Sequence, residues 1–438
     1  MSLFSVTNSR STSRCSWILA VMFCSTVFLG LAPGTVDAQD QQKNYKMIPK
    51  ERTILPNAKK LRMLKSELKE AISTGGAPTE AQRKTFQQFY IYHVLASMTR
   101  PEGWSDPELM PEWRRQVVSD LDRLRDNPTK HRYVRDLIFS TASKIAANAD
   151  YAPVTRYNAL LIVGELNERE KQGSGREIRP AIPYARARDE LLKLANNPKE
   201  EEAIRIGALI GLARHARLMA AADAKPNTNI ARTFISILKT EPSPNGDNDG
   251  LWWMQRIAVD AIGNMGKAAA APSLETVLAD SSRPIYLRCA AAEALSKIDF
   301  RNAKVDVNGI AKGLGDLALV SLTKQINSIR KHLEENPTDE RNTRRREFEA
   351  EDAEPEEDPF VTQVRRQLKY ELNCVSEGID GVKAAPGDTT AKNNLTSLGS
   401  ELQRIDQELS GKGMQPEDLF NRITSPARRL ETIVKNIP

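Results

Sequence analysis

The stretch that decides the fold is Leu251–Phe300, LWWMQRIAVDAIGNMGKAAAAPSLETVLADSSRPIYLRCAAAEALSKIDF. It predicts three helices, separated by a short elbow and a sharp turn. Two of them, RIAVDAIGNMG and LRCAAAEALSKI, share one pattern: small residues at the inner positions, a large aliphatic residue late in the helix, and Gly or Ser directly after it. Small residues three and four positions apart let two helices approach closely, and the late aliphatic side chain fills the groove between them.

Two further copies of this pattern lie towards the N-terminus. The four copies align on Arg156, Arg205, Gln255 and Arg288, which are 33 to 50 residues apart. Three more rows follow in this register, an alanine row, an aliphatic row and a small-residue row: Ala159, Ala208, Ala258 and Ala291; Val163, Leu212, Ile262 and Leu295; Gly164, Ala213, Gly263 and Ser296. The last row is apolar in three copies and carries His215 in the second. Because one such hairpin cannot bury its apolar face alone, the repetition predicts a stack of helical hairpins.

The pattern resembles the second helix of HEAT and HEAT-like (PBS-lyase-type) repeats, which typically reads V-R-x-x-A-x-x-A-L-G. The closest match is Leu287-Arg288 followed by Ala291, Ala294 and Leu295, and the resemblance covers roughly residues 130–300. It implies an all-α fold, an α-solenoid of HEAT-like helical hairpins that usually binds proteins through its concave face. It implies no one chemistry, and Gln255 breaks the arginine row.

The N-terminus has the residue pattern of an export signal. Arg10 and Arg14 precede an apolar run over residues 17–31, and small residues around Ala38 suit a signal peptidase. We expect residues 1–38 to be a signal peptide cleaved near Ala38, so that the protein reaches the periplasm or the extracellular space. The apolar run is shorter than the ~20 residues that span a bilayer. We therefore expect membrane attachment only if the signal stays uncleaved.

The charge and the cysteine content argue against a nucleic-acid-binding protein and against a disulfide-stabilised one. The chain carries 63 basic against 57 acidic residues, and this mild excess forms no concentrated basic stripe, so no nucleic-acid partner is expected. Cys15 and Cys24 fall within the signal peptide, which leaves Cys289 and Cys374, far apart and in different segments. These two predict packed thiols rather than a disulfide framework.

The pattern along the chain predicts five segments after the signal peptide. Thr79 and Gln82 form a capping box at the start of the repeats, and Asn197–Glu200 is expected to cap a helix within them. The segments are an extended leader with a short helix (39–78), the HEAT-like solenoid (79–300), a long helix (301–338), a charged linker (339–359) and a C-terminal helical segment (360–438). The last segment has the helices for a small bundle or for a cap on the array.

Motifs for catalysis, metals and cofactors are missing. The four histidines are far apart, and no HExxH motif, zinc-spaced cysteine pair, GxSxG elbow, P-loop or Rossmann fingerprint occurs. The loop Asn245–Gly250 copies the first half of a calcium-binding EF-hand, but Arg256 stands where the bidentate carboxylate belongs. We therefore expect no catalytic residue, no metal, no cofactor and no small-molecule substrate.

Candidate partner-binding residues are Trp252 and Trp253, with Arg205, Arg288 and Arg156. Adjacent helical residues point about 100° apart, so the two indoles cannot enter the same seam. One is expected to pack under the 241–250 loop and the other to face the concave groove beside the arginines, where aromatic and arginine side chains suit a protein partner. Alternatively, the arginines bond to neighbouring carbonyls or acids and stiffen the stack.

The sequence thus predicts an exported, non-catalytic helical-repeat protein that serves as a protein-binding scaffold. Two alternatives stay open. The first is an enzyme or an enzyme-accessory subunit of the HEAT-like lyase type, and the second is a membrane-tethered structural component.

Overall fold

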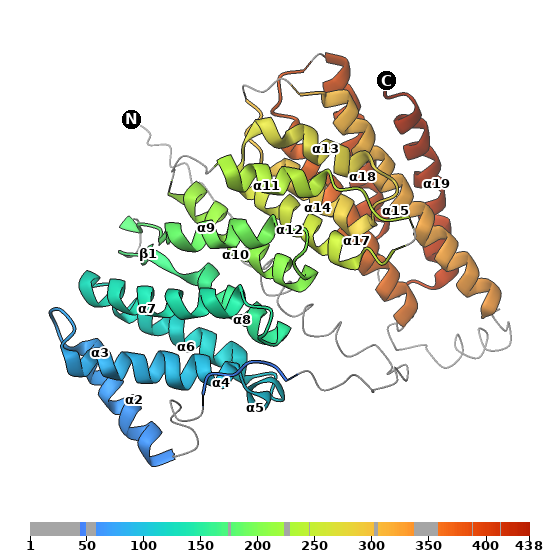
Figure 1. The fold of residues 1–438 in the computed structure, drawn as a ribbon. Helices are drawn as coiled ribbons and strands as arrows, with labels where there is room; N and C mark the ends of the chain where they lie inside the picture. The colour runs from blue at the N-terminus through green and yellow to red at the C-terminus, as the bar shows by residue number, and fades with distance from the viewer. Residues whose placement is uncertain are drawn as a thin grey trace, which may run out of the picture. The chain divides into compact units, whose positions relative to one another are not determined.

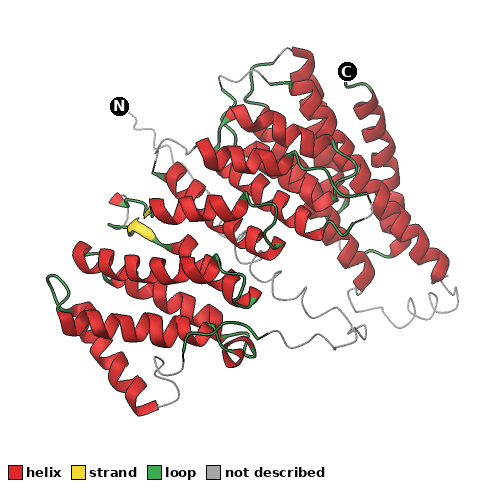
Figure 2. Cartoon of the chain, viewed as in Figure 1, coloured by secondary structure: helices red, strands yellow, loops and turns green. Residues whose placement is uncertain are grey.

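The structure is a computed structural model that describes residues 44–49, 58–173, 177–222, 228–244, 246–301, 305–336, 358–387, 389–411 and 413–438. In these ranges the fold is all-helical, apart from one short two-stranded sheet (Figure 2). The predicted all-α class is therefore confirmed. The predicted signal peptide and nearly all of the predicted charged linker lie outside the described residues.

The first half of the described chain contains eight helical elements, and these are α2 (Ala58–Ser73), α3 (Glu80–Phe86), the π-helical η3 (Gln87–Leu95), α4 (Ala96–Met98), α5 (Pro101–Trp104), α6 (Leu109–Arg123), α7 (Pro128–Ala146) and α8 (Pro153–Glu165). The predicted capping box at the start of α3 is confirmed. The amide of Gln82 donates to Thr79 Oγ1 at 3.3 Å, and the amide of Thr79 donates to Gln82 Oε1 at 3.1 Å.

The second half contains α9 (Ala185–Ala195), α10 (Glu202–Ala221), α11 (Thr228–Leu238), α12 (Asp249–Met265), the 3₁₀ turn η5 (Ala268–Ala270), α13 (Ala271–Ala279), α14 (Ile285–Ser296), α15 (Val307–Glu335), α17 (Pro359–Val382), α18 (Thr389–Glu408) and α19 (Pro416–Lys435). Between α8 and α9, strand β1 (Asn167–Arg169) pairs antiparallel with β2 (Ile182–Pro183). The sequence pattern did not predict this hairpin, because its strands are too short to show an alternating period.

The described helices have a repeat-like arrangement (Figure 1). Helices α8, α10, α12 and α14 lie side by side in this order, and each packs on the helix directly before it, α7, α9, α11 and α13. The alanine row lies in the seams, since all four of its residues are fully buried: Ala159, Ala208, Ala258 and Ala291. The rows read from the sequence thus mark equivalent positions of successive hairpins.

The small-residue row sets how closely these helices approach. A Cβ atom added to Gly164 would lie 2.8 Å from the Cα atom of Gly211, and one added to Gly263 would lie 2.8 Å from the Cβ atom of Ala294. Neither distance is possible between real carbon atoms without movement of a helix. The predicted close approach of helices on small residues is therefore confirmed at both seams.

The predicted cap of α10 is wrong. Helix α10 begins at Glu202, its N-cap residue is Glu201, and no side chain caps it. Instead, the Asn197 side chain accepts a hydrogen bond from the Lys199 amide at 3.1 Å. Glu200 therefore precedes the helix, and its carboxylate lies 2.7 Å from Arg156 Nη2.

The C-terminal helices pack on the repeat-like helices as well as on one another. Helix α17 packs on α14 and α15, and both α18 and α19 pack on α15. Asp358 is the N-cap residue of α17, and its side chain accepts a hydrogen bond from the Phe360 amide at 2.7 Å. The sequence left open whether these helices form a small bundle or a cap on the array. They pack on one another, as in a bundle, and α17 packs on α14, as in a cap.

His215 occupies the last row of the repeat, where the other copies carry apolar residues. It is buried, and its Nε2 atom has no hydrogen-bond partner among the described residues. Burial, followed by the charges of Arg214 and Arg188, lowers the pKa of His215 to about 3. The ring is therefore neutral in the folded protein at neutral pH.

Ala258→Leu is expected to destabilise the fold by about 1–3 kcal/mol, because the added methylenes must enter a fully packed seam. The free energy of unfolding in urea measures this. Ala220→Leu on the exposed surface of α10 is the control and should change that free energy by less than about 0.5 kcal/mol. Equal losses in both variants would contradict the packing described.

The free energy of unfolding should decrease as the pH falls, partly because of His215. Its folded pKa lies below the unfolded value of about 6.5, so the unfolded chain takes up the proton first as the pH falls. The stabilisation is complete above pH 6.5 and is lost as the pH falls towards 3. His215→Leu should therefore reduce the loss of unfolding free energy between pH 7 and pH 5 by about 2 kcal/mol. An unchanged pH profile in urea titrations would contradict the burial of a neutral ring.

Candidate functional site

The repeat arginines cap helix ends inside the stack. The Nε atoms of Arg156, Arg205 and Arg288 donate to backbone carbonyls that lie ten residues earlier, Ala146 at 3.0 Å, Ala195 at 3.3 Å and Leu278 at 2.8 Å. These acceptors stand at or next to the last residue of α7, α9 and α13, where helix carbonyls lack intrahelical partners. Each arginine thus ties the two helices of its own hairpin together.

Two of the predicted partner-binding residues, Arg156 and Arg288, have buried side chains. Arg156 is 1% exposed and Arg288 2% exposed. The structure instead supports the alternative for these positions, in which the repeat arginines bond to neighbouring carbonyls and acids. Arg156 adds carboxylates to its carbonyl, with Glu200 at 2.7 Å and Glu201 at 3.4 Å. Arg205 is half-buried and bonds in the same way as the other two.

Gln255 fills the arginine position in α12 together with a second residue. Its Nε2 atom donates to the carbonyls of Ile237 at 3.1 Å and Thr240 at 2.9 Å, at the end of α11. Its Oε1 atom accepts from Arg283 Nη1 at 2.6 Å, and Arg283 Nη2 donates to the Leu238 carbonyl at 3.0 Å. Arg283 precedes α14 in the chain, so a guanidinium from the next hairpin completes the cap that Gln255 alone would leave open.

Trp252 and Trp253 lie in different environments, as predicted. Trp252 is partly buried and packs against the hydrophobic core, whereas Trp253 is 49% exposed. Trp253 stands two residues before the aligned arginine position, and the equivalent residues of α8, α10 and α14 are also exposed: Val154, Ala203 and Tyr286. An exposed row therefore crosses successive helices on the side away from the alanine row.

Further exposed apolar residues continue this row. Tyr286 of α14 is 43% exposed, and Tyr370 of α17 is 47% exposed. Ile210 of α10 is exposed on the same helical stripe as Ala203, about two turns further along. We call Ile210, Trp253, Arg256, Tyr286 and Tyr370 the exposed face. Only Trp253 among them could be identified from the sequence, because a half-exposed tyrosine has no sequence signature of its own.

Arg256 is held at the centre of the exposed face. Its Nε atom lies 3.1 Å from Asp260 Oδ2, its Nη2 atom 3.8 Å from Glu293 Oε2, and its Nη1 atom donates to the Tyr286 carbonyl at 3.5 Å. Burial would lower the pKa of Arg256, but Asp260, Tyr370 and Glu293 together raise it above the ordinary value. The guanidinium therefore stays charged and is oriented by three groups.

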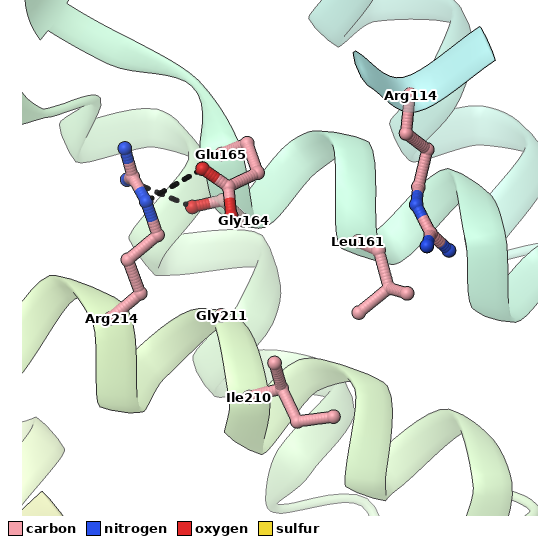
Figure 3. Close-up of a pocket in the computed structure, with 7 residues that line it drawn as sticks. All are labelled: Arg114, Leu161, Gly164, Glu165, Ile210, Gly211 and Arg214. Carbon is pink, nitrogen blue, oxygen red and sulfur yellow. Dashed lines mark hydrogen bonds and ion pairs between the residues drawn. The ribbon is translucent and has the colours of Figure 1, made fainter. Parts of the chain in front are cut away.

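A small pocket opens beside Ile210 (Figure 3). It has a volume of about 150 Å³, and it is lined by Arg114, Leu161, Gly164, Glu165, Ile210, Gly211 and Arg214. Figure 3 shows Arg214 paired with Glu165 on one side, Arg114 on the other, and the apolar side chains of Leu161 and Ile210 between them. The volume is below the roughly 300–1,000 Å³ of small-molecule sites and suits a single side chain.

Both arginines of the pocket have internal partners. Arg214 Nε binds Glu165 Oε2 at 2.8 Å, and its Nη1 atom donates to the Gly164 carbonyl at 3.2 Å. Arg114 donates from Nη1 to Asn158 Oδ1. Burial is the largest cause of the lowered pKa of each arginine. The pocket is thus a preformed polar rim around an apolar floor.

Among the described residues, no group of three or more His, Cys, Asp or Glu side chains is placed to hold a metal ion. None of the helices in the described ranges is both long and apolar enough to cross a membrane. No protein-family model matches the chain, and a search of curated proteins finds no match. The resemblance to HEAT-like repeats therefore rests on the residue rows of the sequence.

Gln255→Ala and Arg283→Ala are each expected to destabilise the protein, because each leaves carbonyls at the end of α11 without a buried donor. The two changes should be non-additive, with a coupling free energy of about 0.5–3 kcal/mol in a double-mutant cycle. Urea unfolding of the two single variants and the double variant measures it. Arg301→Ala, which removes a surface ion pair, is the control and should have little effect. Strict additivity would show that the cap is not shared.

Proposed function

We propose that the chain is a HEAT-like α-solenoid that acts as an exported, non-catalytic scaffold and binds protein partners through its concave face. The exposed face is the part of it that we assign to the partner. The observation that carries this proposal is a row of half-exposed aromatic side chains around one oriented arginine, with a side-chain-sized pocket next to it.

The composition of the exposed face favours a protein partner. Trp, Tyr and Arg are the residues that most often carry the binding energy of protein interfaces, especially when a rigid support holds them. Trp253 and Tyr286 stand on two helices that pack side by side, so they present large apolar area from a fixed backbone. A rigid aromatic surface loses little conformational entropy when a partner binds.

The charges on this side of the molecule argue for a peptide surface rather than a phosphate backbone. Arg214 is paired with Glu165, and Arg256 with Asp260 and Glu293. Nucleic-acid binding depends on basic side chains that are available to neutralise phosphates. A partner with apolar side chains, one of which enters the pocket beside Ile210, fits these paired charges better.

The two alternative functions remain predictions. An enzyme or enzyme-accessory subunit of the HEAT-like lyase type would need an acid–base pair with perturbed pKa values in a closed pocket. A membrane-tethered component depends on the N-terminal segment, and N-terminal sequencing of the mature protein distinguishes it from a cleaved scaffold.

Trp253→Ala is expected to weaken partner binding at least tenfold, because truncation of a central interface tryptophan costs about 2 kcal/mol or more. Arg256→Ala should weaken it as well. The partner is first isolated from the envelope or medium fraction of the host on the immobilised chain, and its affinity for each variant is then measured by calorimetry.

Met63→Ala is the matched control, since Met63 is an equally exposed apolar residue on α2, away from the exposed face. It should retain the wild-type affinity. If all variants recover the same proteins in equal amount, the partner binds to a part of the chain other than the exposed face. Recovery of no specific protein by the wild-type chain would count against the scaffold function itself.

A further inference from the structure

The fold brings Cys289 and Cys374 together. Cys289 lies on α14 and Cys374 on α17, and these two helices pack directly on each other. Both thiols are free and fully buried, so the expectation that each is a packed thiol is confirmed. Their meeting was not predicted, because about 85 residues separate them in the sequence.

One contact places Cys374 against the side of α14 that carries Cys289. Cys374 Sγ donates to Glu293 Oε1 at 3.1 Å. Glu293 follows Cys289 by four residues on α14, so its carboxylate and the Cys289 thiol share one side of that helix.

The backbones of α14 and α17 touch along this seam. A Cβ atom added to Gly378 would lie 3.1 Å from the Ala292 carbonyl oxygen, and one added to Gly381 would lie 2.4 Å from the Cα atom of Ser296. Gly378 and Gly381 follow Cys374 by four and seven residues, on the same side of α17. A disulfide needs Cα atoms about 4.4–6.8 Å apart, which ordinary helix packing rarely offers and a backbone-to-backbone seam does.

We propose that Cys289 and Cys374 form an intramolecular disulfide, made by thiol–disulfide exchange with a low-molecular-weight or protein disulfide while the chain folds. The thiolate of one cysteine attacks a sulfur of the oxidant and releases one thiol, which leaves a mixed disulfide. The second cysteine attacks the cysteine sulfur of the mixed disulfide and releases the other thiol. The protein loses two protons and two electrons, and the oxidant is reduced to two thiols.

Exchange takes place before α17 docks on α14. Once docked, both sulfurs are shielded from solvent. The adjacent Cys289 thiol, burial and the Glu293 carboxylate together raise the pKa of the Cys374 thiol well above its ordinary value. Since the thiolate is the attacking species, the native dithiol reacts slowly, whereas the unfolded chain has ordinary thiols. The bond then holds the first C-terminal helix on the last repeat-like hairpin.

The test uses the full chain with Cys15→Ser and Cys24→Ser, so that Cys289 and Cys374 are the two cysteines that can form a disulfide. The chain is unfolded in urea, refolded in a buffer of reduced and oxidised glutathione, quenched with acid, alkylated and digested without reduction. Mass spectrometry should find the Cys289 peptide joined to the Cys374 peptide, with two hydrogens fewer than the separate peptides. Two alkylated cysteines, or glutathione on each cysteine without a cross-link, would overturn the proposal.

A second measurement uses thermal stability. Natively purified protein is incubated with oxidised glutathione at a urea concentration within the unfolding transition, where α17 leaves α14 in part of the molecules, and the urea is then removed. The thermal midpoint is compared with that of the reduced protein. The midpoint should rise by several degrees, because the bond closes a long loop. Cys374→Ser should show no rise under the same oxidant. An equal response of both proteins, or of neither, would contradict the disulfide.

Discussion

The unpaired carbonyls at the end of each first helix are the constraint on which the repeat-like part depends. A buried carbonyl without a donor costs about as much as several good apolar contacts provide. In three hairpins an arginine from the second helix supplies the donor across ten residues, and in the third hairpin along the chain Gln255 and Arg283 share the task. Once the guanidinium is fixed there, the alanine three residues later, almost one turn along the helix, must face the neighbouring helix.

That arrangement also decides which residues remain for a partner. The side of each second helix that carries the arginine and the alanine is used for packing, and the opposite stripe is left to solvent. Trp253 and Tyr286 occupy this stripe, and Arg256 follows Trp253 by one turn. The exposed face is therefore a consequence of the same register that builds the core, extended by Tyr370 from a helix much later in the chain.

Much of the fold could be predicted, because it depends on local spacing. The alanine and small-residue rows identified the seams, and Thr79 with Gln82 identified a helix start. The candidate site was harder to predict from the sequence. Whether a repeat arginine is buried depends on whether the fold brings it to the carbonyl ten residues earlier in the chain. Arg156 binds Glu200, which had been expected to cap α10, and Cys289 and Cys374 lie on two helices that pack together although 85 residues separate them. Only Trp253 of the exposed face was named from the sequence, on the argument that adjacent indoles diverge.

Arg283 contributes to the cap of a helix in the preceding hairpin, and this contact affects how cooperatively the hairpins unfold. Helix α11 ends on donors that belong partly to the segment leading into α14, so the hairpin of α11 and α12 is complete only while its successor is folded. In the hairpins that carry their own arginine, the donor for the carbonyl at the end of the first helix comes from the same hairpin. Local opening near α14 should therefore spread backwards into α11 before it reaches the earlier hairpins, which gives the stack a preferred direction of unravelling.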